Sequence, residues 1–174
     1  MIEVVLRAVR VDVGSATPLL LLEELAGERV LPIFIGAPEA TAIAYALQHL
    51  ETPRPMSHDL MSTIITSLGG RLFTVEITEL IDNTFYANLR ILRDASEIVV
   101  SARPSDAVAL ALRAGAPILV SDSLMDEQGR IMQLEDDDEI DEMIEGAAGE
   151  SDEAELVAEL REFLDTIRPE DFNQ

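Results

Sequence analysis

The sequence FTVEITELIDNTFYANLRILRDASEIVVSA, residues 73–102, decides the fold class of this chain. Apolar and polar residues alternate from Phe73 onward, which is the two-residue period of a strand with one buried face. An Asp-Asn pair then predicts a tight turn into a second alternating run over residues 85–91. Because a further apolar run follows at residues 98–102, the segment predicts a three-stranded antiparallel meander.

More strands precede this meander. Residues 4–13 and 19–22 are apolar runs, and a turn around Gly27 leads into a third run over residues 29–35. The last two runs predict a hairpin. Pro32 lies inside the third run, which favours an edge or bulged position there because proline donates no backbone hydrogen bond.

Helices are expected between and after the strands. Apolar residues at helical spacing predict helices that begin near Glu39 and Ser57, with Ser57 as a plausible N-cap and Leu60, Ile64 and Leu68 as the apolar stripe of the second. A third helix is expected to begin at Pro104 and to be closed by Gly115, with a last short strand at 118–120. We therefore expect an α+β fold, with helices packed against a mixed or antiparallel sheet.

Charge is distributed unevenly along the 174 residues. The net charge is −22, all twelve basic residues are arginine, and cysteine is absent, which excludes disulfides and thiolate metal sites. Residues 1–120 carry a net charge of −5 and residues 121–174 carry −17. This balance disfavours binding to phosphate backbones, which reward clustered cationic side chains.

The charge pattern also predicts the domain organisation. We expect a folded domain over residues 1–130, an acidic and disordered linker over 131–155, and a short amphipathic helix over 156–174. No apolar run approaches the ~20 residues of a membrane span. Because the N-terminus carries Glu3 where a signal peptide would have basic residues, we expect a cytoplasmic protein.

Glu39, His58 and Asp59 are candidate site residues at predicted helix starts. Glu39 fits either helix stabilisation by a first-turn acid or a role as metal ligand or base. His58 fits either a general base or metal ligand, or a capping or core histidine. Adjacent side chains on a helix do not face each other, so His58 and Asp59 each need a partner from elsewhere in the fold.

Arg103 and Asp106 form the next candidate pair. Together they fit a phosphate clamp at a helix N-terminus, or a first-turn acid with a neighbouring arginine. Arg54 precedes His58, and Tyr86 alternates with Phe85 so that it faces solvent or a cleft. No phosphate-binding loop, dinucleotide fingerprint or nucleophile elbow is present in the sequence.

Four short segments that contain these candidate residues resemble the bifunctional nuclease (BFN) domain family, in order and at matching spacing over residues 1–125. They are residues 31–36 (LPIFIG) with Glu39 and Ala40, residues 54–60 (RPMSHDL), residues 83–87 (NTFYA), and residues 102–107 (ARPSDA).

The resemblance implies a curved, partly barrel-like sheet with helices packed on it, and nuclease activity on DNA and RNA. By position it implies a catalytic set of Glu39, His58, Asp59 and Asp106, with Arg54, Tyr86 and Arg103 binding substrate. On this hypothesis Glu39, Asp59 and Asp106 hold Mg²⁺ or a similar divalent cation, and His58 assists proton transfer.

The alternative is a non-enzymatic binding or regulatory module. Its acidic tail would engage a basic protein partner or mask the domain's own site. The expected partners are therefore nucleic acid, which the net charge disfavours, a basic protein, or a second copy of the chain, with no membrane.

Overall fold

The computed structural model describes residues 1–12, 15–50 and 52–131, so the expected helix over 156–174 and all but the first residue of the expected linker lie outside the described residues. The elements follow the order β1 (Ile2–Val11), β2 (Pro18–Glu24), β3 (Arg29–Phe34), α1 (Ala37–Leu47), α2 (Ser57–Ser67), β4 (Gly70–Ile81), β5 (Thr84–Arg93), β6 (Ser96–Ala102), α3 (Pro104–Ala114), β7 (Ile118–Val120), α4 (Asp122–Gln128) and β8 (Arg130–Ile131).

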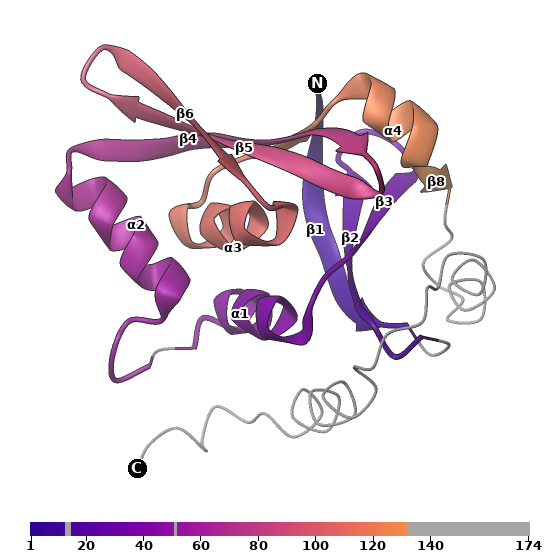
Figure 1. The fold of residues 1–174 in the computed structure, drawn as a ribbon, viewed down its shortest axis with the longest axis horizontal. Coiled ribbons are helices and arrows are strands. Elements are labelled where there is room, and N and C mark those ends of the chain that lie inside the picture. Colours follow the sequence, from indigo (N-terminus) through magenta and orange to yellow (C-terminus); the bar gives the residue numbers. More distant parts are fainter. Residues whose placement is uncertain (13–14, 51, 132–174) are drawn as a thin grey trace.

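The described strands form one mixed sheet in the order β6-β5-β4-β7-β1-β2-β3-β8. Strands β4 and β7 are parallel, and every other neighbouring pair is antiparallel. Figure 1 shows β4–β6 running across the view while β1–β3 run down it, so the sheet twists strongly between its halves. The α+β prediction is confirmed, but the barrel-like form is confirmed only in part, because among the described strands β6 and β8 remain separate edges.

The predicted meander is present as β4, β5 and β6. Asp82 and Asn83 connect β4 to β5 with φ angles of 48° and 58°, the left-handed conformations that a two-residue hairpin turn requires. The register between β4 and β5 shifts twice, at Leu72/Thr74 and at Ile77/Glu79. Such bulges increase the local twist, which bends this half of the sheet over the helices.

The three-residue strand β7 joins the two halves of the sheet. It pairs in parallel with β4 and antiparallel with β1, and Ile118 and Val120 are buried between the halves. Thr74 and Ser121 extend this contact: Thr74 Oγ1 donates to the carbonyl of Pro117 (3.1 Å), and Ser121 Oγ donates to the carbonyl of Thr78 (2.7 Å). The predicted strand at 118–120 is therefore the element that makes one sheet from two meanders.

Helix α3 is the central helix of the core. Pro104 begins it as predicted, and Gly115 ends it in the left-handed conformation with φ 62°. Five consecutive residues from Ala107 to Ala111 are buried, and α3 contacts α1, α2, β4 and β5. Figure 1 shows α1 and α3 stacked under the sheet with α2 beside them. The small alanine side chains allow this close approach.

Helix α2 differs from its prediction in two ways. Its N-cap is Met56 rather than Ser57, and the backbone N–H of Met56 donates to Asp59 Oδ2 (2.9 Å). The predicted apolar stripe of Leu60, Ile64 and Leu68 is exposed rather than packed, and His58 is the buried residue of this helix. The reason is that α2 lies at the rim, against α3 and β4, and contacts them through another side.

Helix α4 was not predicted, because apolar periodicity is weak over its seven residues. The N-cap Ser121 accepts a hydrogen bond from the backbone N–H of Leu124 (3.3 Å), and Leu124 and Met125 are buried against the core. At the other end of the sheet, Pro32 pairs with Leu21 on one side while β8 reaches only as far as Val30. Pro32 therefore lies at an edge, as predicted.

In the part of the chain that the structure describes, no helix combines the length and hydropathy needed to span a membrane.

A core truncation tests the packing of β2. Leu20→Ala should lower the free energy of unfolding by about 2–5 kcal/mol, because a fully buried leucine leaves a cavity. The matched control is Leu25→Ala in the exposed turn after β2, which should change stability by no more than about 0.5 kcal/mol. Urea unfolding of the two variants measures the difference, and equal losses would contradict the core assignment.

Candidate functional site

Three helix starts bring the candidate residues together. Glu39 lies in the first turn of α1, His58 at the start of α2, and Asp106 in the first turn of α3, whose N-cap is Arg103. Because β3 leads into α1 and β6 leads into α3, the two halves of the sheet bring Glu39 and Arg103 to the same place.

Arg103 is the centre of an ion-pair network. Its Nε donates to Asp106 Oδ2 (2.7 Å), its Nη2 to Asp106 Oδ1 (3.1 Å) and its Nη1 to Glu39 Oε1 (2.7 Å). Asp106 Oδ1 also contacts Nε2 of the buried His58 at 3.1 Å. Four of the predicted site residues, Glu39, His58, Arg103 and Asp106, therefore form one hydrogen-bonded cluster.

The network fixes the charge state of its members. Burial by itself would raise the pKa of Asp106, but the hydrogen bonds from Arg103 and His58 outweigh it and hold that pKa below the ordinary value. The carboxylates of Asp106 and Glu39 in turn raise the pKa of Arg103 further above its ordinary range. Asp106 is therefore a carboxylate at neutral pH, and as an acceptor it takes a hydrogen bond from the N–H of His58 Nε2.

A pocket of about 430 Å³ opens beside the network. Glu39, Arg103 and Ser105 line one side of it, and Asn83 and Phe85 line another. The side chain of Arg103 is 64% exposed, so its guanidinium reaches from the network into solvent at this pocket. The pocket thus combines an accessible cation with the hairpin turn between β4 and β5.

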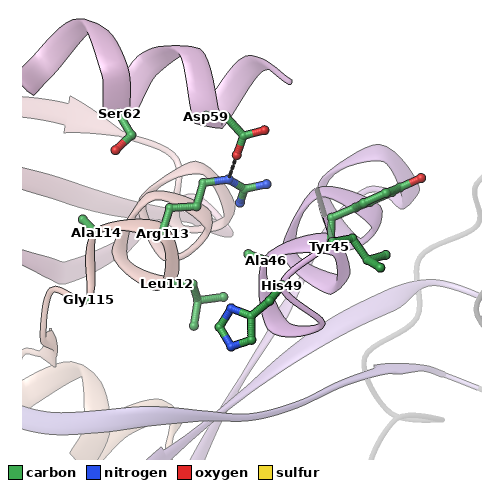
Figure 2. A pocket seen from close by; sticks show the side chains of 10 residues that line it. Tyr45, Ala46, His49, Asp59, Ser62, Leu112, Arg113, Ala114 and Gly115 are labelled. Carbon is green, nitrogen blue, oxygen red and sulfur yellow. Dashed lines mark hydrogen bonds and ion pairs between the residues drawn. The ribbon is translucent and has the colours of Figure 1, made fainter. Parts of the chain in front are cut away.

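Asp59 points away from the cluster. Its Oδ1 accepts from Arg113 Nε, and this contact is the dashed line in Figure 2. Burial alone would raise the pKa of Asp59, but the hydrogen bonds from Arg113 and from the Met56 backbone lower it. His58 and Asp59 therefore have separate partners, as their adjacent positions on a helix predicted.

Arg113 connects the three packed helices. Besides Asp59 of α2, it donates to the carbonyl of Ala109 in α3 (3.0 Å) and to the carbonyl of Ala42 in α1 (3.1 Å). Its side chain is only 10% exposed, and all three guanidinium nitrogens are engaged. Sequence reasoning overlooked Arg113, although a lone arginine in an otherwise apolar helix was a signal.

Figure 2 shows the second pocket, of about 650 Å³, whose lining includes Asp59, Arg113, Tyr45 and His49. His49 is exposed. Because Asp59 and Arg113 form an ion pair with each other, we interpret this pocket as a structural junction between helices.

The remaining two candidates lie outside the cluster. Tyr86 pairs with Glu79 in the β4–β5 ladder and is exposed, whereas its neighbour Phe85 lines the 430 Å³ pocket. The alternation of β5 thus directs Phe85, not Tyr86, to the site. Arg54 is an exposed residue of the loop before α2.

The expected divalent cation does not fit the side chains as they are arranged. Glu39 and Asp106 are both held by Arg103, and Asp59 is held by Arg113. Over residues 1–12, 15–50 and 52–131, no three His, Asp or Glu side chains are grouped as metal ligands. Magnesium is usually bound through one or two carboxylates together with water and substrate oxygens, whereas here each candidate carboxylate is hydrogen-bonded to an arginine.

The fold and the cluster define an α+β domain with a part-buried His–Asp pair and an exposed arginine at a pocket. The chain belongs to the bifunctional nuclease domain family, whose domain matches residues 20–133. An uncharacterized protein of Mycobacterium tuberculosis strain H37Rv is 44% identical over 170 residues, which are 98% of this chain and 97% of the relative.

Proteins named bifunctional nuclease are more distant relatives. Bifunctional nuclease 1 of Oryza sativa subsp. japonica is 27% identical over 53% of this chain and 29% of its own length. Bifunctional nuclease 1 of Arabidopsis thaliana is 26% identical over 58% of this chain and 32% of its own length. Nuclease-related function is thus supported at the level of the family.

Removal of the Arg113 guanidinium should destabilise the helix layer. We expect Arg113→Met to lower the free energy of unfolding by about 2–3 kcal/mol, because the Ala42 carbonyl and Asp59 lose their donor while the apolar stem is kept. Arg93→Met, at an exposed position at the end of β5, is the control and should be near neutral. Chemical unfolding at neutral pH measures both, and a near-neutral Arg113→Met would remove its structural role.

The lowered pKa of Asp106 predicts a pH dependence of stability. Because the folded-state pKa lies below the ordinary value of about 3.9, the carboxylate stabilises the fold above that value and stops doing so as pH falls through the folded pKa. Asp106→Asn should lower the free energy of unfolding by about 1–2 kcal/mol at neutral pH. The difference in unfolding free energy between this variant and the wild type should become smaller below about pH 4.

The control for the pH experiment is Glu28→Gln, at an exposed turn position. It should track wild type over the whole pH range. A gap between Asp106→Asn and wild type that stays constant down to about pH 2 would contradict the carboxylate's role.

Proposed function

We propose that this chain hydrolyses phosphodiester bonds of nucleic acid at the cluster of Glu39, His58, Arg103 and Asp106. The observation that carries the proposal is the hydrogen bond between His58 Nε2 and Asp106 Oδ1 (3.1 Å), beside an exposed arginine at a pocket. Membership of the bifunctional nuclease domain family supports the reaction class.

His58 is proposed as the general base. The carboxylate of Asp106 accepts the hydrogen on Nε2, so that the neutral imidazole has its lone pair on Nδ1. Among the described residues no completely buried side-chain nitrogen or oxygen lacks a hydrogen-bond partner. The hydrogen bond of the His58 ring is made by Nε2, so Nδ1 is not completely buried. A buried ring that is oriented by a carboxylate and open to solvent at one nitrogen suits proton transfer.

In the proposed reaction, the oxygen of a water molecule attacks phosphorus while Nδ1 of His58 takes one of its protons. The bond between phosphorus and the leaving oxygen breaks, and that oxygen is protonated from solvent. Hydrolysis needs no oxidant, reductant or second substrate. Arg103 contributes charge stabilisation of the phosphate oxygens after exchanging one of its carboxylate contacts for the phosphate.

A cleavage assay tests this proposal with labelled single-stranded DNA and RNA, in the presence and absence of a divalent cation. We expect His58→Ala to reduce the cleavage rate by about 10²–10⁴-fold, because it removes the proposed base. Arg103→Ala should reduce the rate too, whereas Arg7→Ala should not, although both arginines are exposed members of ion pairs.

Retention of full activity by both His58→Ala and Asp106→Asn would disprove the assignment and indicate a contaminating nuclease. Circular dichroism of each variant separates loss of chemistry from loss of fold.

A non-enzymatic binding or regulatory module is the second candidate function. The observation in its favour is that Arg103 is already paired with two carboxylates, which leaves the cluster acidic within a body of net charge −5 over residues 1–120. A wild-type protein that binds nucleic acid or a basic protein, and cleaves nothing under any cation, would favour this module.

A further inference from the structure

Strand β6 forms an open edge of the sheet. It pairs with β5 on one side and is the last strand in the order, so within the described residues its other side has no neighbour. Figure 1 shows it on the far side of the sheet from β1–β3. Natural monomers protect such an edge with proline, charged side chains (above all lysine) or a bulge. Strand β6 contains no proline or lysine, its register with β5 is uninterrupted, and its one charged side chain, Glu97, is ion-paired with Arg90.

The backbone groups on this open edge can be assigned from the hairpin. A two-residue loop connects Arg93 to Ser96, which makes these two residues a hydrogen-bonded pair. Because such pairs alternate along an antiparallel ladder, Ile98 and Val100 direct their backbone groups to β5. The N–H and C=O groups that point outward are therefore those of Glu97, Val99 and Ser101.

Each face of the edge carries apolar side chains, and on one face Val99 lies between Glu97 and Ser101. Ile98 pairs with Ile91 and Val100 pairs with Leu89, so these side chains lie on the helix-covered face of the sheet. Val99 lies on the opposite face. Ile98, Val99 and Val100 are each more than 40% exposed.

Helix α2 adds apolar surface near the same end of the sheet. Gly70 begins β4 two residues after Leu68, the C-cap of α2, and it pairs with Arg93, which pairs with Ser96 of β6. The end of α2 thus lies two strands from the beginning of β6. Its exposed apolar side chains are Leu60, Met61, Ile64 and Leu68.

We propose that β6 pairs antiparallel with β6 of a second copy of this chain, around a two-fold axis at Val99. In this register Val99 faces its own copy, Ile98 faces Val100, and Glu97 faces Ser101. The outward groups of Glu97, Val99 and Ser101 then form six backbone hydrogen bonds, because each residue meets a partner whose groups also point outward.

Self-complementarity is the reason for choosing a second copy as the partner. A two-fold interface requires a surface that matches itself, and here β-branched residues oppose β-branched residues while the acid opposes a serine. No two like charges are brought directly opposite each other. Glu97 is also neutralised within its own chain by Arg90 Nη1 (2.6 Å).

Size and charge set the conditions for association. A stable interface buries roughly 800 Å² on each partner, so the paired copies have to cover the exposed apolar residues of α2 as well as the seven-residue strand. Each copy carries a net charge of −22, so the copies repel each other at low ionic strength. Association should therefore strengthen with salt.

Pairing would also affect the cluster described above, because Arg103 directly follows the last residue of β6. The strand end that carries Arg103 would become part of a longer ladder. The pairing of β6 does not depend on the proposed nuclease function, and it is tested by mass and cross-linking.

Light scattering of the full chain tests the pairing. We expect a mass of about 38 kDa, twice the 19.0 kDa of one chain, at about 0.5 M NaCl. The Val99→Lys variant should have the mass of one chain, because pairing would place two lysines opposite each other at the two-fold axis. Val5→Lys, at an exposed position on β1, should keep the double mass. A wild-type mass of one chain, or a Val99→Lys variant that retains the double mass, overturns the proposal.

Cross-linking gives an independent measurement if Val99→Lys fails to fold. The chain has no cysteine, so Val99→Cys provides a single thiol at the axis, where Cα atoms of a paired strand lie about 5.5 Å apart, within disulfide range. Mild oxidation should give a disulfide-linked dimer of Val99→Cys and little of Leu25→Cys, an exposed control far along the sheet order. Equal cross-linking of the two variants would contradict the β6 interface.

Discussion

The fold depends on the insertion of β7 between β4 and β1. Without this three-residue strand the chain would have two separate antiparallel meanders, each with an apolar face and an unprotected edge. The ladder hydrogen bonds of β7, together with the side chains of Thr74 and Ser121, connect the meanders on both sides of the strand. Burial of Ile118 and Val120 makes separation of the halves costly in apolar surface as well.

The candidate site is a consequence of that connection. Glu39 follows β3, which belongs to one half of the sheet, and Arg103 follows β6, which belongs to the other. Their ion pair at 2.7 Å therefore joins the two halves across the layer of helices. His58 reaches the same point because α2 crosses α3, with His58 placed on Asp106 and Asp59 placed on Arg113.

These ion pairs explain how carboxylates can lie close together in the helix layer of a chain whose net charge is −22. Each carboxylate of the helix layer has an arginine partner, and the lowered pKa values of Asp59 and Asp106 follow from those partners. The same pairing engages the oxygens that a divalent cation would need. The cluster thus combines a buried histidine with an exposed arginine, and the chemistry proposed for it does not assign the carboxylates to a metal.

Local sequence determined most of the secondary structure. The two-residue alternation over 73–102 produced β4–β6, and Pro104 and Gly115 bounded α3, because these signals act within a few residues of the chain. Glu39, His58, Arg103 and Asp106 could also be selected, since each stands at a predicted helix start. Tertiary structure decided which of them meet. The contact of His58 with Asp106 spans 48 positions, that of Asp59 with Arg113 spans 54, and the apolar stripe of α2 faces solvent. Periodicity reports that a helix has two faces, but only its packing against α3 and β4 determines which face is covered.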